Sequence, residues 1–350
     1  MPRFRPQDLK RFSQDILQSL GASVQEASLV ARLLLDADLT GHDSHGIIQI
    51  PGYLEAFGTG LIVPGAHTTH ERETPATALL DGHWGFGHKL AYEAMQLAID
   101  KARMCGVSAI GARHCYHVGH LGVYVREAAA AGMVGFMVVN DGGGGQRVVP
   151  YGGVAGRLST NPLAVGLPTG NAVPFVLDMS TSVVAEGQVR LKWMRGESLP
   201  LGWMIDAFGR PTIDPEDFFR ETGSLLPLGG EAGHKGYGLA IAVEALAGIL
   251  GRAGYSKVPI PPYNNGIFIM VVEISRFLAL DDFTAEVREL IGYLKSCPRA
   301  PGTSEILYPG EQAERTRQRR LQEGIEVDSE TWRRLQAVAQ ERDIPVPSSV

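Results

Sequence analysis

The stretch VSAIGARHCYHVGHLGVYVREAAAAGMVGFMVVN, residues 107–140, decides the fold class of this chain. Residues 107–112 and 133–140 are short apolar runs rich in β-forming residues, which is typical of strands. Between them, residues 121–131 place apolar side chains at helical spacing. Strands that alternate with helices in this way predict an α/β fold.

The sequence on either side continues this pattern. Further strands are expected at 77–80, 174–179 and 266–272, and further helices at 88–104, 234–250 and 283–294. Residues 141–233 contain many glycines and prolines, which favour strands joined by long loops over helices.

Both ends of the chain are expected to be helical. Residues 7–20 have helical spacing, and Ser23 with Glu26 forms a capping box for a second helix that ends at Leu39. Residues 310–343 are rich in Glu and Arg, with apolar residues at helical intervals, so one face should pack on the N-terminal helices. The expected domains are a helical part over 1–72, an α/β part for cofactor and substrate over 73–298, and C-terminal helices that pack on the first part over 299–350.

The length and charge of the chain exclude several classes of protein. Its 350 residues suffice for about two domains with their own cores. The 32 basic and 38 acidic residues give a net charge of −6, so binding to nucleic acid or to an anionic membrane is not expected. Three cysteines without metal-binding spacing, no apolar leader segment and no apolar stretch long enough to span a membrane indicate a cytoplasmic protein.

Half of the ten histidines lie in two short clusters. His42 and His45 follow the second helix, and His114, His117 and His120 follow a strand. An imidazole with a pKa near 6.5 exchanges protons at neutral pH, as alcohol oxidation and carbonyl reduction require. The second cluster also suggests a metal site, although on a helix its third member would point away from its first. Histidines with a purely structural role are the third interpretation.

The usual phosphate-binding motifs, G-x-G-x-x-G after the first strand and G-x-x-x-x-G-K-[ST], are absent from the sequence. Glycines 142–145 follow a strand, but Gln146 and Arg147 stand where the last glycine would be needed. Residues 159–162 can be interpreted as an ordinary turn or as a polar clamp. Residues 178–182 can be interpreted as a helix cap or as a ribose-binding segment. The segment 233–238 opens a helix with a lysine among glycines, which is typical of anion binding.

Eight motifs in fixed order resemble the type-2 malate/lactate dehydrogenase family, which also includes ureidoglycolate and sulfolactate dehydrogenases. Each motif alone is weak, but together they span nearly the whole chain, and the first is most similar to the hydroxycarboxylate dehydrogenase branch. They are Asp43-Ser44-His45-Gly46, His117-Val118-Gly119, Ser159-Thr160-Asn161-Pro162, Asp178-Met179-Ser180-Thr181-Ser182, Pro200-Leu201-Gly202-Trp203 with Asp214-Pro215, Pro227-Leu228-Gly229-Gly230, His234-Lys235-Gly236-Tyr237-Gly238 and Pro309-Gly310-Glu311.

This resemblance implies a non-Rossmann, mixed-sheet nucleotide-binding domain and a helical domain made from both chain ends. It implies NAD or NADP as cofactor, a 2-hydroxy or 2-oxo acid as substrate, and a homodimer. His45 and His117 would carry the acid/base chemistry, with Ser44 assisting His45, and no bound metal is expected. The implied substrate contacts are Gln49, Tyr53, Thr160 and Asn161. The implied cofactor contacts are His117, Gly119, His120, Leu121, Asp141, Asp178, Met179, Ser180, His234, Lys235, Pro309, Gly310 and Glu311.

The expected reaction is reversible hydride transfer between a nicotinamide and C2 of a 2-hydroxy acid. The chain departs from the family at two positions: Gln49 replaces an arginine suited to a substrate carboxylate, and Gln188 replaces a lysine. Three alternatives stay open. They are an imine reductase for piperideine or pyrroline carboxylates, a metal-dependent hydrolase that uses the histidine cluster, and a non-catalytic dinucleotide-binding protein.

Overall fold

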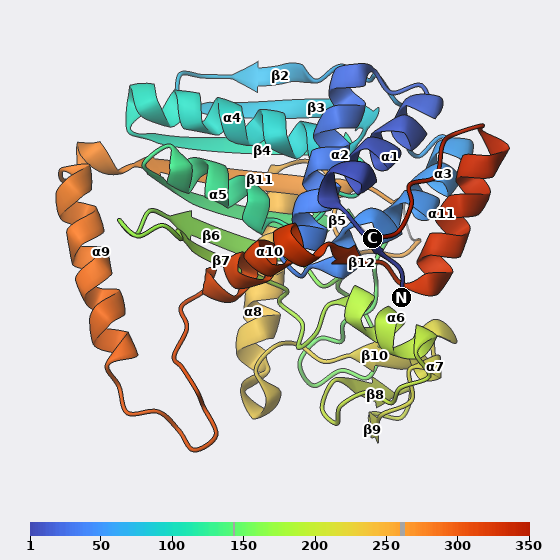
Figure 1. Ribbon diagram of the computed structural model, residues 1–350. Helices are drawn as coiled ribbons and strands as arrows, with labels where there is room; N and C mark the ends of the chain where they lie inside the picture. The colour runs from blue at the N-terminus through green and yellow to red at the C-terminus, as the bar shows by residue number, and fades with distance from the viewer. Residues whose placement is uncertain (143, 260–262) are drawn as a thin grey trace.

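A computed structural model describes residues 1–142, 144–259 and 263–350 (Figure 1). Gly143, from the run of four glycines, and residues 260–262 lie outside the described part. At the centre is a seven-stranded sheet in the order β2-β3-β4-β11-β5-β6-β7, in which β3 and β4 are parallel and the other neighbours antiparallel. The mixed, non-Rossmann sheet is therefore confirmed. Its strands are β2 (Thr69–Glu73), β3 (Thr77–Gly85), β4 (Val107–Cys115), β5 (Met133–Asp141), β6 (Leu163–Leu167), β7 (Phe175–Met179) and β11 (Asn265–Glu273).

The alternation of side chains along these strands builds one core on each face of the sheet. On one face, Met137 and Ile267 belong to a core with residues of α4 and α5, whereas Val138 and Phe268, one position further along, pack against α8 and η4 on the other face. The expected helix over 234–250 is thus present, but its second half is a π-helix. These helices are α4 (Gly87–Cys105), α5 (Gly122–Ala130), α8 (His234–Val243) and the π-helix η4 (Glu244–Leu250).

The two ends of the chain form one helical part, as expected (Figure 1). The rings of Phe4 and Trp332 lie with their centroids 4.0 Å apart, and both belong to the same buried cluster. A short sheet of β1 (Arg3–Phe4) with β12 (Ile325–Glu326) ties the ends together. Among the described residues, no helix has the length and apolar character needed to cross a membrane. The helices of this part are α1 (Pro6–Ser19), α2 (Val24–Leu39), α3 (Ile50–Gly58), α10 (Glu311–Glu323) and α11 (Ser329–Glu341).

Three local features differ from expectation. Ser23 accepts a hydrogen bond from the backbone N–H of Glu26 at 3.2 Å, but the Glu26 carboxylate accepts from the N–H of Gly65, so only half of the capping box forms. Strand β2 joins the sheet although it precedes the expected strands, and helix α6 lies within the stretch expected to be strands and loops. The remaining elements are α6 (Glu186–Met194), β8 (Met204–Asp206), β9 (Pro211–Thr212), α7 (Glu216–Phe219), β10 (Gly223–Leu225), α9 (Leu280–Lys295) and the short 3₁₀ helices η1 (Asp43–His45), η2 (Ile47–Gln49), η3 (Gly230–Ala232) and η5 (Ile274–Arg276).

Candidate active site

Two of the predicted histidines lie side by side where the helical part meets the sheet. His45 ends η1 and His117 follows β4, and their ring centroids are 5.4 Å apart with planes inclined by 27°. The hydroxyl of Ser44 lies 2.9 Å from Nδ1 of His45, and the hydroxyl of Tyr53 lies 2.9 Å from Nδ1 of His117. Each ring is therefore held through Nδ1. No hydrogen bond to Nε2 of either ring is made within the described part of the chain, so both Nε2 atoms can serve a substrate.

The surroundings keep both rings neutral. Burial lowers the pKa of His45 to about 3, with a further contribution from His117, and burial lowers the pKa of His117 to about 3, with a contribution from His88. A neutral imidazole can accept a proton at one nitrogen or donate a hydrogen bond from the other. The pair thus has the protonation state needed to take a proton from an alcohol and to polarise its oxygen.

The loop that carries His45 is fixed by contacts that only a glycine permits. A Cβ on Gly46 would lie 1.7 Å from Oδ1 of Asp38, and Asp38 accepts a hydrogen bond from the N–H of Ile47 at 3.0 Å. From α10, Arg320 binds the carboxylate of Asp43 and the carbonyl of Asp38. The C-terminal helices therefore contribute directly to the position of His45.

The sheet side of the site is organised by the amide of Asn265. Its Oδ1 accepts from the N–H of Val118 at 3.2 Å, and its Nδ2 donates to the carbonyl of Asn140 at 3.3 Å. Because His117 precedes Val118 and Asp141 follows Asn140, this one amide holds His117 and Asp141 at the same end of the sheet. Sequence analysis did not identify Asn265, because it belongs to no motif.

Asp141 presents a carboxyl group that is only partly satisfied. Its Oδ1 accepts from the N–H of Gly144 at 3.2 Å. The pKa of Asp141 is raised to about 7, mainly by burial and in smaller part by the nearby Glu186 and Glu244, while the Gly144 hydrogen bond opposes the rise. A carboxyl that titrates near neutral pH beside a reactive site is a candidate functional group.

A buried ion network surrounds His120. His120 makes hydrogen bonds with Asp178 at 3.2 Å and with Asp36 at 3.3 Å, and Asp36 also binds Arg126 at 2.6 Å and Arg317 at 2.9 Å. Burial alone would lower the pKa of His120, but the two carboxylates raise it to about 9. His120 is therefore an imidazolium at neutral pH.

The three histidines considered as a metal site take different partners. His114 binds Asp81 at 2.8 Å, His117 faces Tyr53, and His120 lies between its two carboxylates. Among the described residues, the group with ligand-like spacing is instead His42, His120 and Asp178, whose ligand atoms lie within 4.8 Å of one another. The rings of His42 and His120 are stacked, with centroids 4.6 Å apart and planes inclined by 13°. Both ring nitrogens of His120 are already taken by the carboxylates of Asp178 and Asp36, so ion pairing accounts for this group.

Several of the predicted cofactor contacts lie around β7. Asp178 accepts from the N–H of Gly122 at 2.6 Å, next to Leu121 and His120. The N–H of Val176 donates to the carbonyl of Pro309 at 3.0 Å, which places Pro309 and Gly310 beside the same strand. The next residue, Glu311, is held by Lys295 at 2.7 Å. A Cβ on Gly119, whose φ is +78°, would lie 2.5 Å from Nε2 of His88, so this loop requires a glycine there.

The remaining predicted cofactor contacts lie near the start of α8. Met179 pairs with Leu163 in the sheet, and the hydroxyl of Ser180 donates to the carbonyl of Ser182 at 2.9 Å. Beyond this strand, the carbonyl of Thr181 accepts from Leu228, whose own carbonyl accepts from Gly236 in the first turn of α8. His234 and Lys235 are exposed at that helix start. Backbone hydrogen bonds through Thr181 and Leu228 thus connect the end of β7 with the start of α8.

The predicted substrate contacts divide into two groups. Tyr53 touches His117, and Nε2 of Gln49 donates to the carbonyl of Ser44 at 2.6 Å, so both adjoin the histidine pair. Thr160 uses its carbonyl to bind Thr181. Asn161 is fully buried and donates from Nδ2 to Glu244 at 2.9 Å, so its side chain faces the interior.

His88 is a neighbour of the pair that sequence analysis did not identify. It is 2% exposed, its ring stands edge-on to His117 with centroids 6.0 Å apart, and neither ring nitrogen has a hydrogen-bond partner in the described part of the chain. Burial lowers the pKa of His88 to about 3. Its position at the start of an amphipathic helix gave no signal in the sequence, because the contact with His117 arises only from packing.

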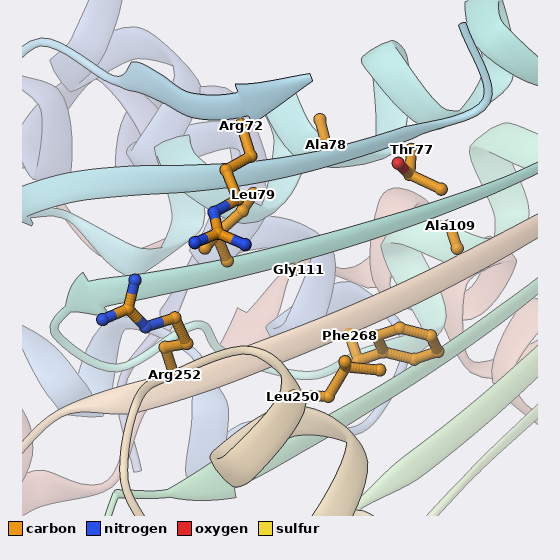
Figure 2. A pocket seen from close by; sticks show the side chains of 9 residues that line it. All are labelled: Arg72, Thr77, Ala78, Leu79, Ala109, Gly111, Leu250, Arg252 and Phe268. Carbon is orange, nitrogen blue, oxygen red and sulfur yellow. The ribbon is translucent and has the colours of Figure 1, made fainter. Parts of the chain in front are cut away.

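A cavity of about 550 Å³ lies apart from this site, on the sheet face beside the end of η4 (Figure 2). It is lined by Leu79, Gly111 and Phe268 among others, and Figure 2 shows the guanidinium groups of Arg72 and Arg252 on the same side of it. The residues that line it include none of the predicted site residues.

Comparison with known proteins identifies the class to which this fold and site belong. The family model for malate/L-lactate dehydrogenase matches residues 4–336. The chain is 37% identical over 345 residues to a malate dehydrogenase of Pyrococcus abyssi, covering 96% of this chain and 94% of that protein. It is 36% identical over 348 residues to an L-sulfolactate dehydrogenase of Methanothermobacter thermautotrophicus, covering 98% of each. The structure of malate dehydrogenase from Entamoeba histolytica superposes with a TM-score of 0.92 at 28% identity and covers 99% of each chain.

The chain belongs to the malate/L-lactate dehydrogenase family. The resemblance that the eight motifs indicated is therefore confirmed. The comparisons support an oxidoreductase that interconverts 2-hydroxy and 2-oxo acids with a nicotinamide cofactor, and they do not favour the imine reductase or the metal-dependent hydrolase.

Proposed function

We propose that this protein is an NAD- or NADP-dependent 2-hydroxycarboxylate dehydrogenase in which His45 and His117 act together on the C2 oxygen. The observation that carries the proposal is the geometry of the pair: two neutral rings lie 5.4 Å apart, each fixed at Nδ1 by a hydroxyl group. Two such rings can approach one oxygen from two sides, and general acid/base catalysis requires this convergence.

In the oxidation direction, one Nε2 takes the proton of the C2 hydroxyl while the N–H of the other ring donates a hydrogen bond to the same oxygen. The hydroxyl of Ser44 or Tyr53 on the far nitrogen stabilises the ring that becomes charged, because it can accept from the new imidazolium. In the reduction direction the same ring returns the proton to the oxygen. A bound nicotinamide supplies the hydride chemistry at its C4 position.

The residues present fit a dinucleotide. The exposed Lys235 stands at the N-terminal end of α8, where the helix dipole and free N–H groups favour the pyrophosphate. The loop around Gly119 and Gly122 and the neighbouring Pro309 and Gly310 would hold the rest of the cofactor, together with the other predicted contacts His117, His120, Leu121, Asp178, Met179, Ser180, His234 and Glu311. Gln49 and Thr160 would contact the substrate, Tyr53 would orient the ring of His117, and the buried Asn161 would hold the adjacent Thr160 in place.

The test is a kinetic comparison of His45→Gln and His117→Gln with the wild type. NADH and NADPH oxidation would first be screened with oxaloacetate, pyruvate, 2-oxoglutarate and phenylpyruvate. Loss of either acid/base group should lower kcat by about 10²- to 10⁴-fold, with an unchanged circular dichroism spectrum. His83→Gln, a change at an exposed histidine, is the matched control. Near-normal turnover in both site variants would remove the assignment.

We further propose a homodimer. Large apolar side chains are exposed on α8, η4 and α9, and Leu250 also borders the cavity on the sheet face. An apolar surface of this kind is typical of a protein interface. Light scattering should therefore give twice the mass of one chain. The exposed side chains are Leu239, Ile241, Ile249, Leu250, Leu290, Tyr293 and Leu294.

The proposed location is the cytoplasm. Its reducing conditions suit the three unpaired cysteines, of which Cys105 and Cys297 are exposed and Cys115 is buried.

A further inference from the structure

The charged groups around the histidine pair are unevenly distributed. The first turn of α6 lies against η1, because a Cβ on Gly187 would be 2.5 Å from Cβ of Ser44. This turn carries Glu186, whose carboxylate is 3.5 Å from Arg190 on the exposed side of the helix, and the neutral Gln188. On the other side of Ser44, Gln49 is neutral as well.

The basic side chains that reach this region are already paired. Arg320 is bound to Asp43, and the network around His120 contains Arg126 and Arg317 on Asp36. Asp141, in contrast, has no basic partner among the described residues. Its Oδ2 accepts no hydrogen bond from the described residues either. This oxygen keeps some contact with solvent, since the buried polar atoms without a partner do not include it. It is therefore available to a ligand.

Asp141 lies at the same sheet end as the catalytic pair. The amide of Asn265 bridges the residues next to His117 and Asp141, and the Asp141 carboxylate lies beside the hydroxyl of Ser159, since both approach Gly145 within 2.7 Å of its absent Cβ. The phenols of Tyr116 and Tyr263, whose rings are 4.7 Å apart, adjoin the same carboxylate. A substrate whose C2 oxygen meets His117 would direct a substituent toward this carboxyl group.

We propose that Asp141 is a specificity-determining residue, which selects 2-oxo acids whose C3 substituent carries a hydrogen-bond donor, uncharged or cationic, over those that carry a second anionic group. This inference rests on the proposed function. A donor such as a carboxamide N–H can bind Oδ2 directly. A second carboxylate would face Asp141, which has no basic partner among the described residues, and like charges in a partly buried site lower affinity by about tenfold or more.

The carboxyl group of Asp141 also makes this selection depend on pH. The groups that face it are Glu186 on α6, Glu244 on η4 and the two phenols, so no neighbouring base neutralises it. With a pKa of about 7, Asp141 is largely protonated at pH 6 and ionised at pH 8.5. Discrimination against a second anion should therefore grow as the pH rises, whereas effects at His45 and His117 act on all substrates alike.

The test uses oxaloacetate and its C4 amide, 2-oxosuccinamate, which have the same shape and differ by one charge. In the wild type, kcat/KM for the amide should exceed that for oxaloacetate by about tenfold or more at pH 8.5, and the ratio should shrink at pH 6. In Asp141→Asn the ratio should fall toward one at both pH values. Asp100→Asn, the same change on the exposed end of α4, should keep the wild-type ratio and its pH dependence.

Three results have distinct meanings. If pyruvate, oxaloacetate and the amide all fail to oxidise NADH or NADPH, the proposed function itself is wrong. If 2-oxo acids are reduced but oxaloacetate is preferred at both pH values, Asp141 does not select the substituent. If Asp141→Asn weakens the binding of NADH or NADPH to the same extent with every substrate, the carboxylate belongs to the cofactor site, and the inference is also overturned. The pH dependence of the substrate ratio is measured on the wild type. It therefore tests the inference even if Asp141→Asn does not fold.

Discussion

The ion network around His120 makes a strong prediction about pH and stability. The pKa of His120 is raised from its ordinary 6.5 to about 9, because the pull of Asp178 and Asp36 exceeds the effect of burial. A group whose pKa is raised on folding stabilises the folded state fully below its unfolded pKa and loses that contribution as the pH rises through its folded pKa. With these two values, the contribution of His120 falls by about 2–3 kcal/mol between pH 7 and pH 10.

The assay is urea unfolding of the wild type and of His120→Gln at pH 7 and pH 10. Lysines and tyrosines also titrate in this range, so the relevant quantity is the difference between the two proteins at each pH. His120→Gln should lower the free energy of unfolding by about 2–3 kcal/mol more at pH 7 than at pH 10. His70→Gln, at an exposed histidine paired with Glu73, should show almost no such difference.

Equal costs of His120→Gln at both pH values would refute this reasoning. A second measurement does not depend on the variant: in the wild type, nuclear magnetic resonance should find the ring of His120 still protonated at pH 8. A ring that loses its proton near pH 6.5 would mean that the two carboxylates do not hold it as an ion.

Two further predictions concern the site and the helical part. Tyr53→Phe removes the hydroxyl on Nδ1 of His117, a hydrogen bond worth about 1–2 kcal/mol, so kcat should fall by about 5- to 30-fold with little change in KM; an unaffected kcat in steady-state assays would show that Tyr53 does not orient the ring. Trp332→Ala removes the side chain that packs on Phe4 between the two chain ends. It should lower the free energy of unfolding by about 3–5 kcal/mol in urea titrations. A loss below about 1 kcal/mol would mean that the ends do not share a core.

The central α/β unit could be predicted from the sequence because its signals are local. Strand β4 and strand β5 are apolar runs, and α4 and α5 carry helical spacing, so each element is recognisable within its own residues. The π-helix after Val243 was not predictable in the same way, because a π-helix and an α-helix show nearly the same pattern of apolar residues. Strand β2 gave no apolar signal, since all of its residues are exposed, and α6 has only Val189 buried.

The site was predicted less completely, and for a physical reason. His45 and His117 were identified by their cluster and by the family motifs, but only the folded chain brings them within stacking distance. Asn265 and His88 act through contacts with residues far away in the chain, and no local pattern marks such contacts. Asp36 is also invisible in the sequence, since it lies 84 positions before His120.

The placement of the pair would link the proposed catalysis to the packing of the two chain ends. His45 belongs to the helical part, where Arg320 on α10 fixes Asp43 two residues before it, whereas His117 belongs to the sheet and is held through Val118 and Asn265. The distance between the two rings is therefore set by how the helical part packs on the sheet, and not by either element alone. Catalysis by two convergent imidazoles loses rate with displacements of about 1 Å, so changes in the C-terminal helices should alter kcat although they touch no substrate.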